Sequence, residues 1–269
     1  MARVSICLPV YNGEAFVEKA LESIAAQTFG DYVVMASDNA SSDATSDILR
    51  DWSTKIPMQI VRQPETLPMI EHFNSLLDRV DTPAYMLLCH DDYFYSAQAI
   101  ELAEKILDEH PSTSAVYSDL VYVSEHGRPL AHRRFRRSGE QQADSLGAQT
   151  LRTARNMFGI PILVRTTARG AHRYDPRLHY LADADLSWRI SQHAPLWHIP
   201  EVILANRYNG QNSTWSLLGD AKREFLLMAE KHSVPMSPPA QLLLAVMNWQ
   251  VSRQKQLFGL YERLVTRLG

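Results

Sequence analysis

The chain has 269 residues, 45% of them hydrophobic, and its formal net charge is −3 at pH 7. This length suits one large domain or a domain with a subdomain, and the apolar content is enough for a sizeable core. The small net charge gives no reason to expect nucleic acid as a partner. The two cysteines, Cys7 and Cys89, fall on expected buried strands, which fits a reducing compartment. Because neither an apolar leader nor a run of roughly 18 apolar residues is found, we expect a cytoplasmic protein that could still contact a membrane surface.

Strands and helices alternate over the first 113 residues. The expected strands are short apolar runs that end in turn or capping residues, at Val4–Val10, Tyr32–Ala36, Met58–Arg62 and Ala84–Leu88. The expected helices repeat apolar residues on one face, at Phe16–Ile24, Asp43–Trp52, Met69–Val80 and Ala97–Leu107. This alternation predicts an α/β fold with a mostly parallel sheet and helices on both faces.

The pattern is less regular in the rest of the chain. We expect strands at Ser114–Val123, Ile160–Arg165, Leu196–Pro200 and Val202–Ala205, and helices at Leu151–Phe158 and Asp183–His193. Between them we expect an arginine-rich loop at Gly127–Gly147 and a polar loop at Arg207–Thr214. From Pro238 to Gly269, apolar residues recur at spacings of three and four, which predicts an amphipathic helix or helix pair.

Two adjacent carboxylates, Asp91 and Asp92, follow the fourth strand directly after His90. Adjacent carboxylates repel each other, and a divalent cation relieves the repulsion by taking their oxygens as ligands. The carboxyl ends of strands are also where open α/β sheets bind ligands. The sequence therefore predicts a metal site at this edge of the sheet. The alternative interpretation is that both aspartates are turn or capping residues before the next helix.

Four motifs occur in a fixed order along the chain. They are VSICLPVYNGEAFVEKALESIAAQT at 4–28, DNASSDAT at 38–45, His90-Asp91-Asp92, and LADADLSWRI at 181–190. Together they resemble the inverting family 2 glycosyltransferases of the GT-A fold, of the bacterial surface-polysaccharide type. Two positions depart from that family's pattern, because Cys89 and Ala182 stand where relatives usually carry acidic residues.

The resemblance implies a Rossmann-like GT-A domain over residues 1–215, with a nucleotide-binding half (1–113), an acceptor half (114–215) and a helical segment behind it (216–269). It implies a donor site for a nucleotide-diphospho-sugar, formed by Pro9, Val10, Tyr11, Asp38, Asn39, Arg62, His90, Asp91 and Arg207. Asp92 is implied as the direct ligand of Mn²⁺ or Mg²⁺, with Asp91 on the ribose or on a metal-bound water. Asp183 is implied as the base that takes the acceptor's proton, while Asp185 supports its helix.

We therefore expect a metal-assisted single displacement in which an aspartate base helps a hydroxyl replace the nucleotide, with a UDP-sugar as the favoured donor. By analogy with relatives, the acceptor is a saccharide or lipid-linked saccharide of the cell envelope. Two alternatives are a nucleotide-sugar-binding protein with decayed catalysis and a sugar nucleotidyltransferase. The second would need a glycine- and lysine-rich phosphate loop, which Tyr11-Asn12-Gly13 does not provide.

The C-terminal segment after residue 237 has three possible partners for its apolar face. It can pack on its own domain, form a homodimer with a second copy, or lie peripherally on the inner face of the cell membrane. The last interpretation depends on the cations Arg253, Lys255, Arg263 and Arg267, which exceed the acidic residues there and would favour anionic lipids.

Overall fold

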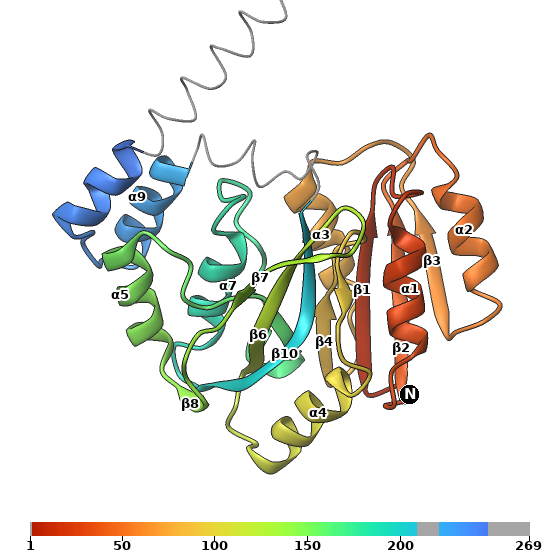
Figure 1. Cartoon of the computed structure of the whole chain (residues 1–269), viewed down its shortest axis with the longest axis horizontal. Coiled ribbons are helices and arrows are strands. Elements are labelled where there is room, and N and C mark those ends of the chain that lie inside the picture. The colour runs from red at the N-terminus through yellow and green to blue at the C-terminus, as the bar shows by residue number, and fades with distance from the viewer. Residues whose placement is uncertain (1, 209–220, 247–269) are drawn as a thin grey trace, which may run out of the picture.

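The computed structural model describes residues 2–208 and 221–246. Within these ranges ten strands form one sheet, in the order β3-β2-β1-β4-β9-β6-β10-β5, with β7 beside β6 and β8 beside β10 (Figure 1). The strands are β1 (Val4–Val10), β2 (Tyr32–Asp38), β3 (Met58–Arg62), β4 (Ala84–Leu87), β5 (Tyr93–Phe94), β6 (Ala115–Ser124), β7 (Pro129–Arg133), β8 (Gly139–Gln141), β9 (Pro161–Arg165) and β10 (Leu196–Tyr208). The helices are α1 (Val17–Ala25), α2 (Thr45–Trp52), α3 (Met69–Leu77), α4 (Ala99–Glu109), α5 (Ala143–Thr153), α6 (Thr166–Arg169), α7 (Ala182–Ile190) and α9 (Ala221–Lys231), and residues 238–246 are also helical.

Strand β1 lies in the middle of the parallel part of the sheet and pairs with β2 on one side and β4 on the other. The chain moves outward from β1 through β2 to β3, and then returns to add β4 on the opposite side of β1. This reversal creates a switch point at the carboxyl ends of β1 and β4, where open α/β sheets form a ligand crevice.

Alternate residues of β1 enter two different cores. Ile6 and Leu8 pack in the cluster that contains the apolar faces of α1, α2 and α4. Cys7 points to the other face and packs with Leu76 of α3. Because both faces of the strand are covered, all seven residues of β1 are buried, as its continuous apolar sequence predicted. The predicted α/β class, with helices on both faces of a mostly parallel sheet, is confirmed.

The arginine-rich stretch expected as a loop is partly regular. It contains β7, β8 and the start of α5, and α5 ends at Thr153 instead of continuing to Phe158. Strand β7 forms because it pairs with β6, where Arg133 lies opposite Leu120. The guanidinium groups of Arg133 and Arg137 each lie 4.8 Å from the ring centroid of Phe135, so both arginine side chains pack against this ring. Pairing with a distant strand is invisible in a local sequence pattern, which explains the wrong prediction.

The end of the acceptor half also differs from expectation. The two short strands predicted between residues 196 and 205 are one strand, β10, with register shifts between Ile199 and Leu204. Arg207 and Tyr208, expected in a polar loop, end this strand, and the remainder of that loop lies outside the described residues.

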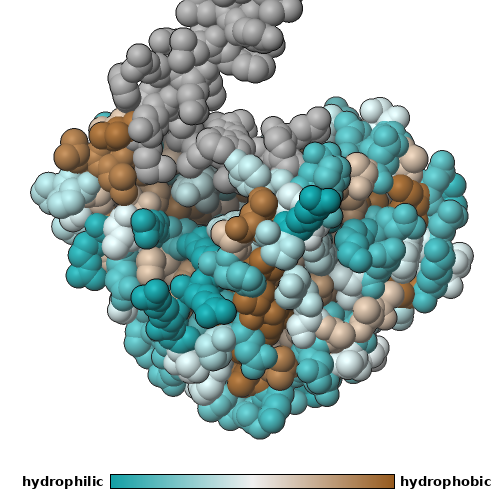
Figure 2. Space-filling view, in the orientation of Figure 1, coloured by the Kyte–Doolittle hydropathy of each residue, from teal (hydrophilic) through white to brown (hydrophobic). Residues whose placement is uncertain are grey.

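The helices after residue 220 pack onto the acceptor half. Phe225 and Met228 of α9 share a buried cluster with Trp188 of α7. Part of the surface of this corner is apolar, as the brown patch at the upper left of Figure 2 shows, and its exposed large apolar side chains are Leu226, Leu242, Leu243 and Val246. The predicted amphipathic helix starts at residue 238, and its part after residue 246 lies outside the described residues. No helix in the described ranges is long and apolar enough to cross a membrane.

Candidate active site

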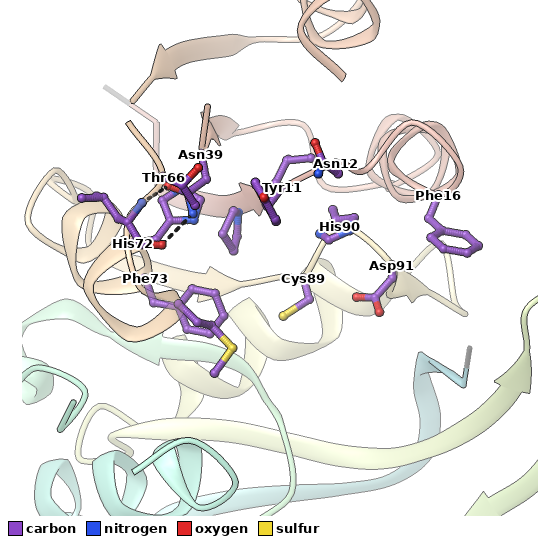
Figure 3. Close-up of a pocket in the computed structure, with 14 residues that line it drawn as sticks. Tyr11, Asn12, Phe16, Asn39, Thr66, His72, Phe73, Cys89, His90 and Asp91 are labelled. Carbon is purple, nitrogen blue, oxygen red and sulfur yellow. Dashed lines mark hydrogen bonds between the residues drawn. The ribbon is translucent and has the colours of Figure 1, made fainter. Parts of the chain in front are cut away.

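A cavity of about 600 Å³ opens at the switch point, against the carboxyl ends of β1, β2 and β4 (Figure 3). Six of the residues expected to bind the donor line it: Pro9, Val10, Tyr11, Asn39, His90 and Asp91. Figure 3 shows that the cavity has two ends, with Asp91 and Phe16 at one and Thr66, His72 and Phe73 at the other. The fold therefore brings these six residues together, whereas Asp38, Arg62 and Arg207 do not line the cavity.

The loop after β1 is held in place by the loop after β2. Asn12, which has a φ of 46°, donates its backbone N–H to Ser41 Oγ at 2.9 Å, and its side-chain oxygen accepts the N–H of Ser42 at 2.9 Å. Gly13 allows close packing here, because a Cβ at this position would lie 2.8 Å from Cδ2 of His90. These contacts hold the loop in place. Tyr11 lines the cavity and is 47% exposed.

Asp91 and Asp92 differ in their surroundings. The Asp91 carboxylate lines the cavity, whereas Asp92 is buried and accepts hydrogen bonds from Asn206 Nδ2 at 2.9 Å and from the backbone N–H of Arg207 at 2.9 Å. Burial and the neighbouring Asp91 charge raise the pKa of Asp92 well above its ordinary range, against the effect of these hydrogen bonds. Asp92 therefore joins the turn to β10, and Asp91 is the aspartate of the pair that lines the cavity.

Three potential metal ligands gather at this turn. Sγ of Cys89 and one carboxylate oxygen each of Asp91 and Asp92 lie within 4.8 Å of one another. The Cys89 thiol and the Asp91 carboxylate extend from the same side of the loop (Figure 3). Oxygen ligands from one or two carboxylates are what Mg²⁺ takes in phosphate sites, so the donor set fits the divalent cation expected from the sequence.

Arg207 supports this turn from behind. Its side chain is buried, and its Nε donates to the carbonyl oxygen of Asp91 at 2.9 Å, while a second guanidinium nitrogen donates to the carbonyl oxygen of Glu125. The guanidinium also lies 5.0 Å from the ring centroid of Phe16. Arg207 is not among the described residues that line the cavity, and it contacts the turn through the carbonyl oxygen of Asp91.

Asp38 and Arg62 form a separate polar cluster beside the cavity. Asp38 is buried and accepts hydrogen bonds from Ser46 Oγ, from Arg62 and from the backbone N–H of Ser41. Burial acts to raise the pKa of Asp38, but the hydrogen bonds from the two serines and the Arg62 charge outweigh it and hold the pKa below its usual value. These contacts fix the end of β2 and leave Asp38 and Arg62 outside the cavity wall.

Asn39 reaches the cavity, but its amide already has partners. Its Oδ1 accepts the backbone N–H of Leu67 at 2.9 Å, and its Nδ2 donates to the Leu67 carbonyl at 2.9 Å. This pair of hydrogen bonds holds the loop between β3 and α3 against the end of β2. The Asn39 side chain, which was expected in the donor site, thus holds part of the cavity wall in place.

Asp183 and Asp185 of α7 differ in their surroundings. Asp183 is half-buried, burial raises the pKa of its carboxyl, and a hydrogen bond from the Tyr174 hydroxyl partly opposes this effect. The pKa of the Cys89 thiol is raised by burial first, then by the charges of Asp92 and Asp91, and then by the charge of Asp183. Asp183 therefore lies toward the same edge of the sheet as Cys89. It is nevertheless not part of the cavity wall.

Asp185 is a structural residue, as the sequence suggested. It is fully buried and accepts hydrogen bonds from Arg189 at 2.8 Å, Lys231 at 2.9 Å and His232 at 3.1 Å. These contacts join α7 to the end of α9.

Several cavity residues were not predicted from the sequence: Asn12, Phe16, Thr66, Leu67, Met69, His72, Phe73 and Cys89, the last of which was read only as a core residue. Most of them follow a strand end or begin the next helix. The rule that ligands bind outside strand carboxyl ends would have pointed to the loop after β3, although not to individual side chains.

Residues 5–168 match the family model described as Glycosyl transferase family 2. The chain belongs to glycosyl transferase family 2. The resemblance read from the four motifs is thereby confirmed, and the chain is a glycosyltransferase by family.

Among curated proteins, the chain is similar to the PGL/p-HBAD biosynthesis glycosyltransferases of Mycobacterium bovis and Mycobacterium tuberculosis. The identity is 26% over 215 residues, which cover 78% of this chain and 79% of the relatives.

Solved structures show the same fold. Staphylococcus aureus TarS superposes with a TM-score of 0.64 and 17% identity over 83% of this chain, which spans only 39% of the TarS chain. Residues 1–349 of TarS in complex with UDP-GlcNAc give a TM-score of 0.65 at 17% identity, with 83% of this chain and 66% of that chain covered. The mannosyltransferase PcManGT from Pyrobaculum calidifontis, in complex with GDP-Man and Mn²⁺, gives 0.61 at 16% identity, with 92% and 69% covered. The predicted GT-A fold is confirmed.

Proposed function

We propose that this glycosyltransferase moves a sugar from a nucleotide-diphospho-sugar to an acceptor hydroxyl by a single inverting displacement that uses a divalent metal. The observation that supports this most directly is the cavity at the switch point, which has the Asp91 carboxylate at one end and room for a nucleotide beside it. A strand-end crevice with a carboxylate at its edge suits a diphosphate that is held through a cation.

Asp91, with Cys89 beside it, is the proposed holder of the ion, in place of the direct role that the sequence suggested for Asp92. The reason is that Asp92 already accepts hydrogen bonds from Asn206 and Arg207. A bound Mn²⁺ or Mg²⁺ would supply positive charge that stabilises the departing diphosphate. Asp92 and Arg207 then fix the position of Asp91.

Asp183 is the proposed base. Its pKa is raised by burial, and a carboxylate with a raised pKa is a better acceptor for the proton of an attacking hydroxyl. In the proposed step the acceptor oxygen forms a bond to the anomeric carbon as the bond from that carbon to the diphosphate oxygen breaks. The hydroxyl proton goes to Asp183, and the electron pair leaves with the nucleoside diphosphate.

The donor and acceptor classes are proposed from the relatives. A UDP-sugar is favoured because TarS was solved with UDP-GlcNAc, although the complex of PcManGT with GDP-Man shows that this fold accepts another base. The mycobacterial relatives act in PGL/p-HBAD biosynthesis, which supports a saccharide or lipid-linked saccharide acceptor in the cell envelope.

A thermal-shift screen of nucleotide sugars with and without Mn²⁺ tests this proposal, since a ligand that binds the native state raises its stability. At roughly 100 times its Kd a donor should add about 2.7 kcal/mol to the free energy of unfolding. The stabilising donor is then incubated with candidate acceptors, and NMR reports the anomeric configuration of the product. Retention of configuration, or stabilisation that is independent of the metal, would contradict the proposed mechanism.

A further inference from the structure

His72 stands in the first turn of α3, at the end of the cavity away from Asp91 (Figure 3). Its residue is only 3% exposed, and its ring Nε2 lies 2.8 Å from Oγ of Ser37 on β2. Its other ring nitrogen, Nδ1, has no hydrogen-bond partner in the described part of the chain and is not completely buried. One side of the imidazole is therefore fixed by the protein, and the other is open to a ligand.

Hydrogen bonds around His72 hold its ring in place. The Ser75 hydroxyl donates to the carbonyl oxygen of His72 at 2.7 Å. The Gln63 amide nitrogen donates to Ser37 Oγ at 3.2 Å, and the same oxygen lies 2.8 Å from Nε2 of His72. A serine oxygen can accept two hydrogen bonds and donate one, so this contact fits either tautomer of the ring. The contact with Ser37 thus fixes the ring through Nε2, and Nδ1 is the ring nitrogen left for a ligand.

The ring is neutral at physiological pH, because burial lowers the pKa of His72 to about 4. Asn39, another polar side chain of the cavity, already exchanges two hydrogen bonds with Leu67. We propose that His72 recognises the nucleobase of the donor through a hydrogen bond between its Nδ1 and a polar atom on the edge of the base. This inference rests on the proposed nucleotide-sugar donor and names a specificity residue for it.

Two substitutions separate recognition from packing. The amide nitrogen of Asn stands near the position of Nδ1, and that of Gln stands near Nε2. His72→Asn should keep the hydrogen bond to the base and lose the contact with Ser37, and His72→Gln should keep the contact with Ser37 and lose the hydrogen bond to the base. We measure the Kd of UDP and of GDP by calorimetry with Mn²⁺ present. For the nucleotide that binds wild type more tightly, His72→Gln should weaken binding roughly 10-fold, the usual worth of one hydrogen bond, while His72→Asn stays within roughly 3-fold.

Inorganic pyrophosphate with Mn²⁺ serves as the control probe, because it has no base, and its Kd should be the same in all three proteins. The ¹⁵N chemical shifts of the His72 ring provide an independent readout, and the Nδ1 shift should change when the nucleotide binds. A larger loss in His72→Asn than in His72→Gln, equal affinity in all three proteins, or an unchanged Nδ1 shift would overturn the inference and leave the proposed function intact. If wild type binds neither UDP nor GDP, both the inference and the proposed donor class are wrong.

Discussion

Mild acid should destabilise this protein through the buried His72 ring. In an unfolded chain the imidazole has a pKa of 6.5, whereas burial lowers it to about 4 in the folded protein. Between these two values the unfolded chain binds a proton that the native state does not. Stability rises with pH wherever the unfolded state binds more protons, so the contribution of His72 is lost as the pH falls from 6.5 toward about 4.

The size of the effect follows from the two pKa values. Each pKa unit corresponds to about 1.4 kcal/mol, so the drop from 6.5 to about 4 is worth roughly 3 kcal/mol once the pH is below both values. Over the accessible window from about pH 7 to about pH 5, most of this appears, about 2 kcal/mol. Natural domains are typically stable by roughly 5–15 kcal/mol, so this loss is a large share of the free energy of unfolding.

Urea unfolding at about pH 7 and about pH 5 measures the effect in wild type and in His72→Gln, which has no titrating ring but can still contact Ser37. Each protein is compared with itself, so the cost of the substitution cancels, as does the titration of the buried His198. Wild type should lose about 2 kcal/mol more than the variant over this window. An equal loss in both proteins would mean that His72 is solvated enough to titrate normally, and would refute the burial that the structure assigns to it.

Three further predictions concern the turn after β4, the base and the apolar corner. Asp91→Asn should abolish Mn²⁺-dependent stabilisation by a nucleoside diphosphate in thermal-shift assays. Asp92→Ala should instead lower the free energy of unfolding, measured in urea, by about 1–3 kcal/mol, because it leaves hydrogen-bond donors unpaired. The reverse pattern would return the direct metal role to Asp92. Asp183→Asn should lower turnover by on the order of 10² to 10⁴ while donor Kd by calorimetry stays near wild type, and retained turnover would place the base elsewhere. Full-length protein should sediment with anionic liposomes at low salt. Leu242 is 67% exposed, and Leu242→Glu should weaken liposome binding roughly 10-fold. No liposome binding by wild type would leave this corner to a protein partner.

The sequence by itself determined the parts of the protein that depend on local patterns. Val4–Val10 and Met58–Arg62 are strands with the predicted bounds. For Val4–Val10 the reason is that a strand buried in a sheet needs a continuous apolar segment bounded by turn residues. The strand-end residues Tyr11 and Asp91 meet at one edge because parallel strands bring their carboxyl ends together. Strand alternation and motif order were enough for the fold class and for the family.

Only the tertiary structure decided where individual side chains point and which of them are already paired. Asp92 is buried and bound to Asn206, which is 114 residues further along the chain. Asn39 is occupied by Leu67 across a separation of 28 residues, and β7 exists because β6 offers it an edge. His72 looks like one more helical residue in the sequence, and its ring meets Ser37 only when α3 packs on the sheet. Hydrogen-bond partners and burial depend on contacts between segments that are distant in the sequence. The sequence pattern can therefore predict the edge of the sheet where a site forms. The packing of the folded chain decides which side chains at that edge are free to act.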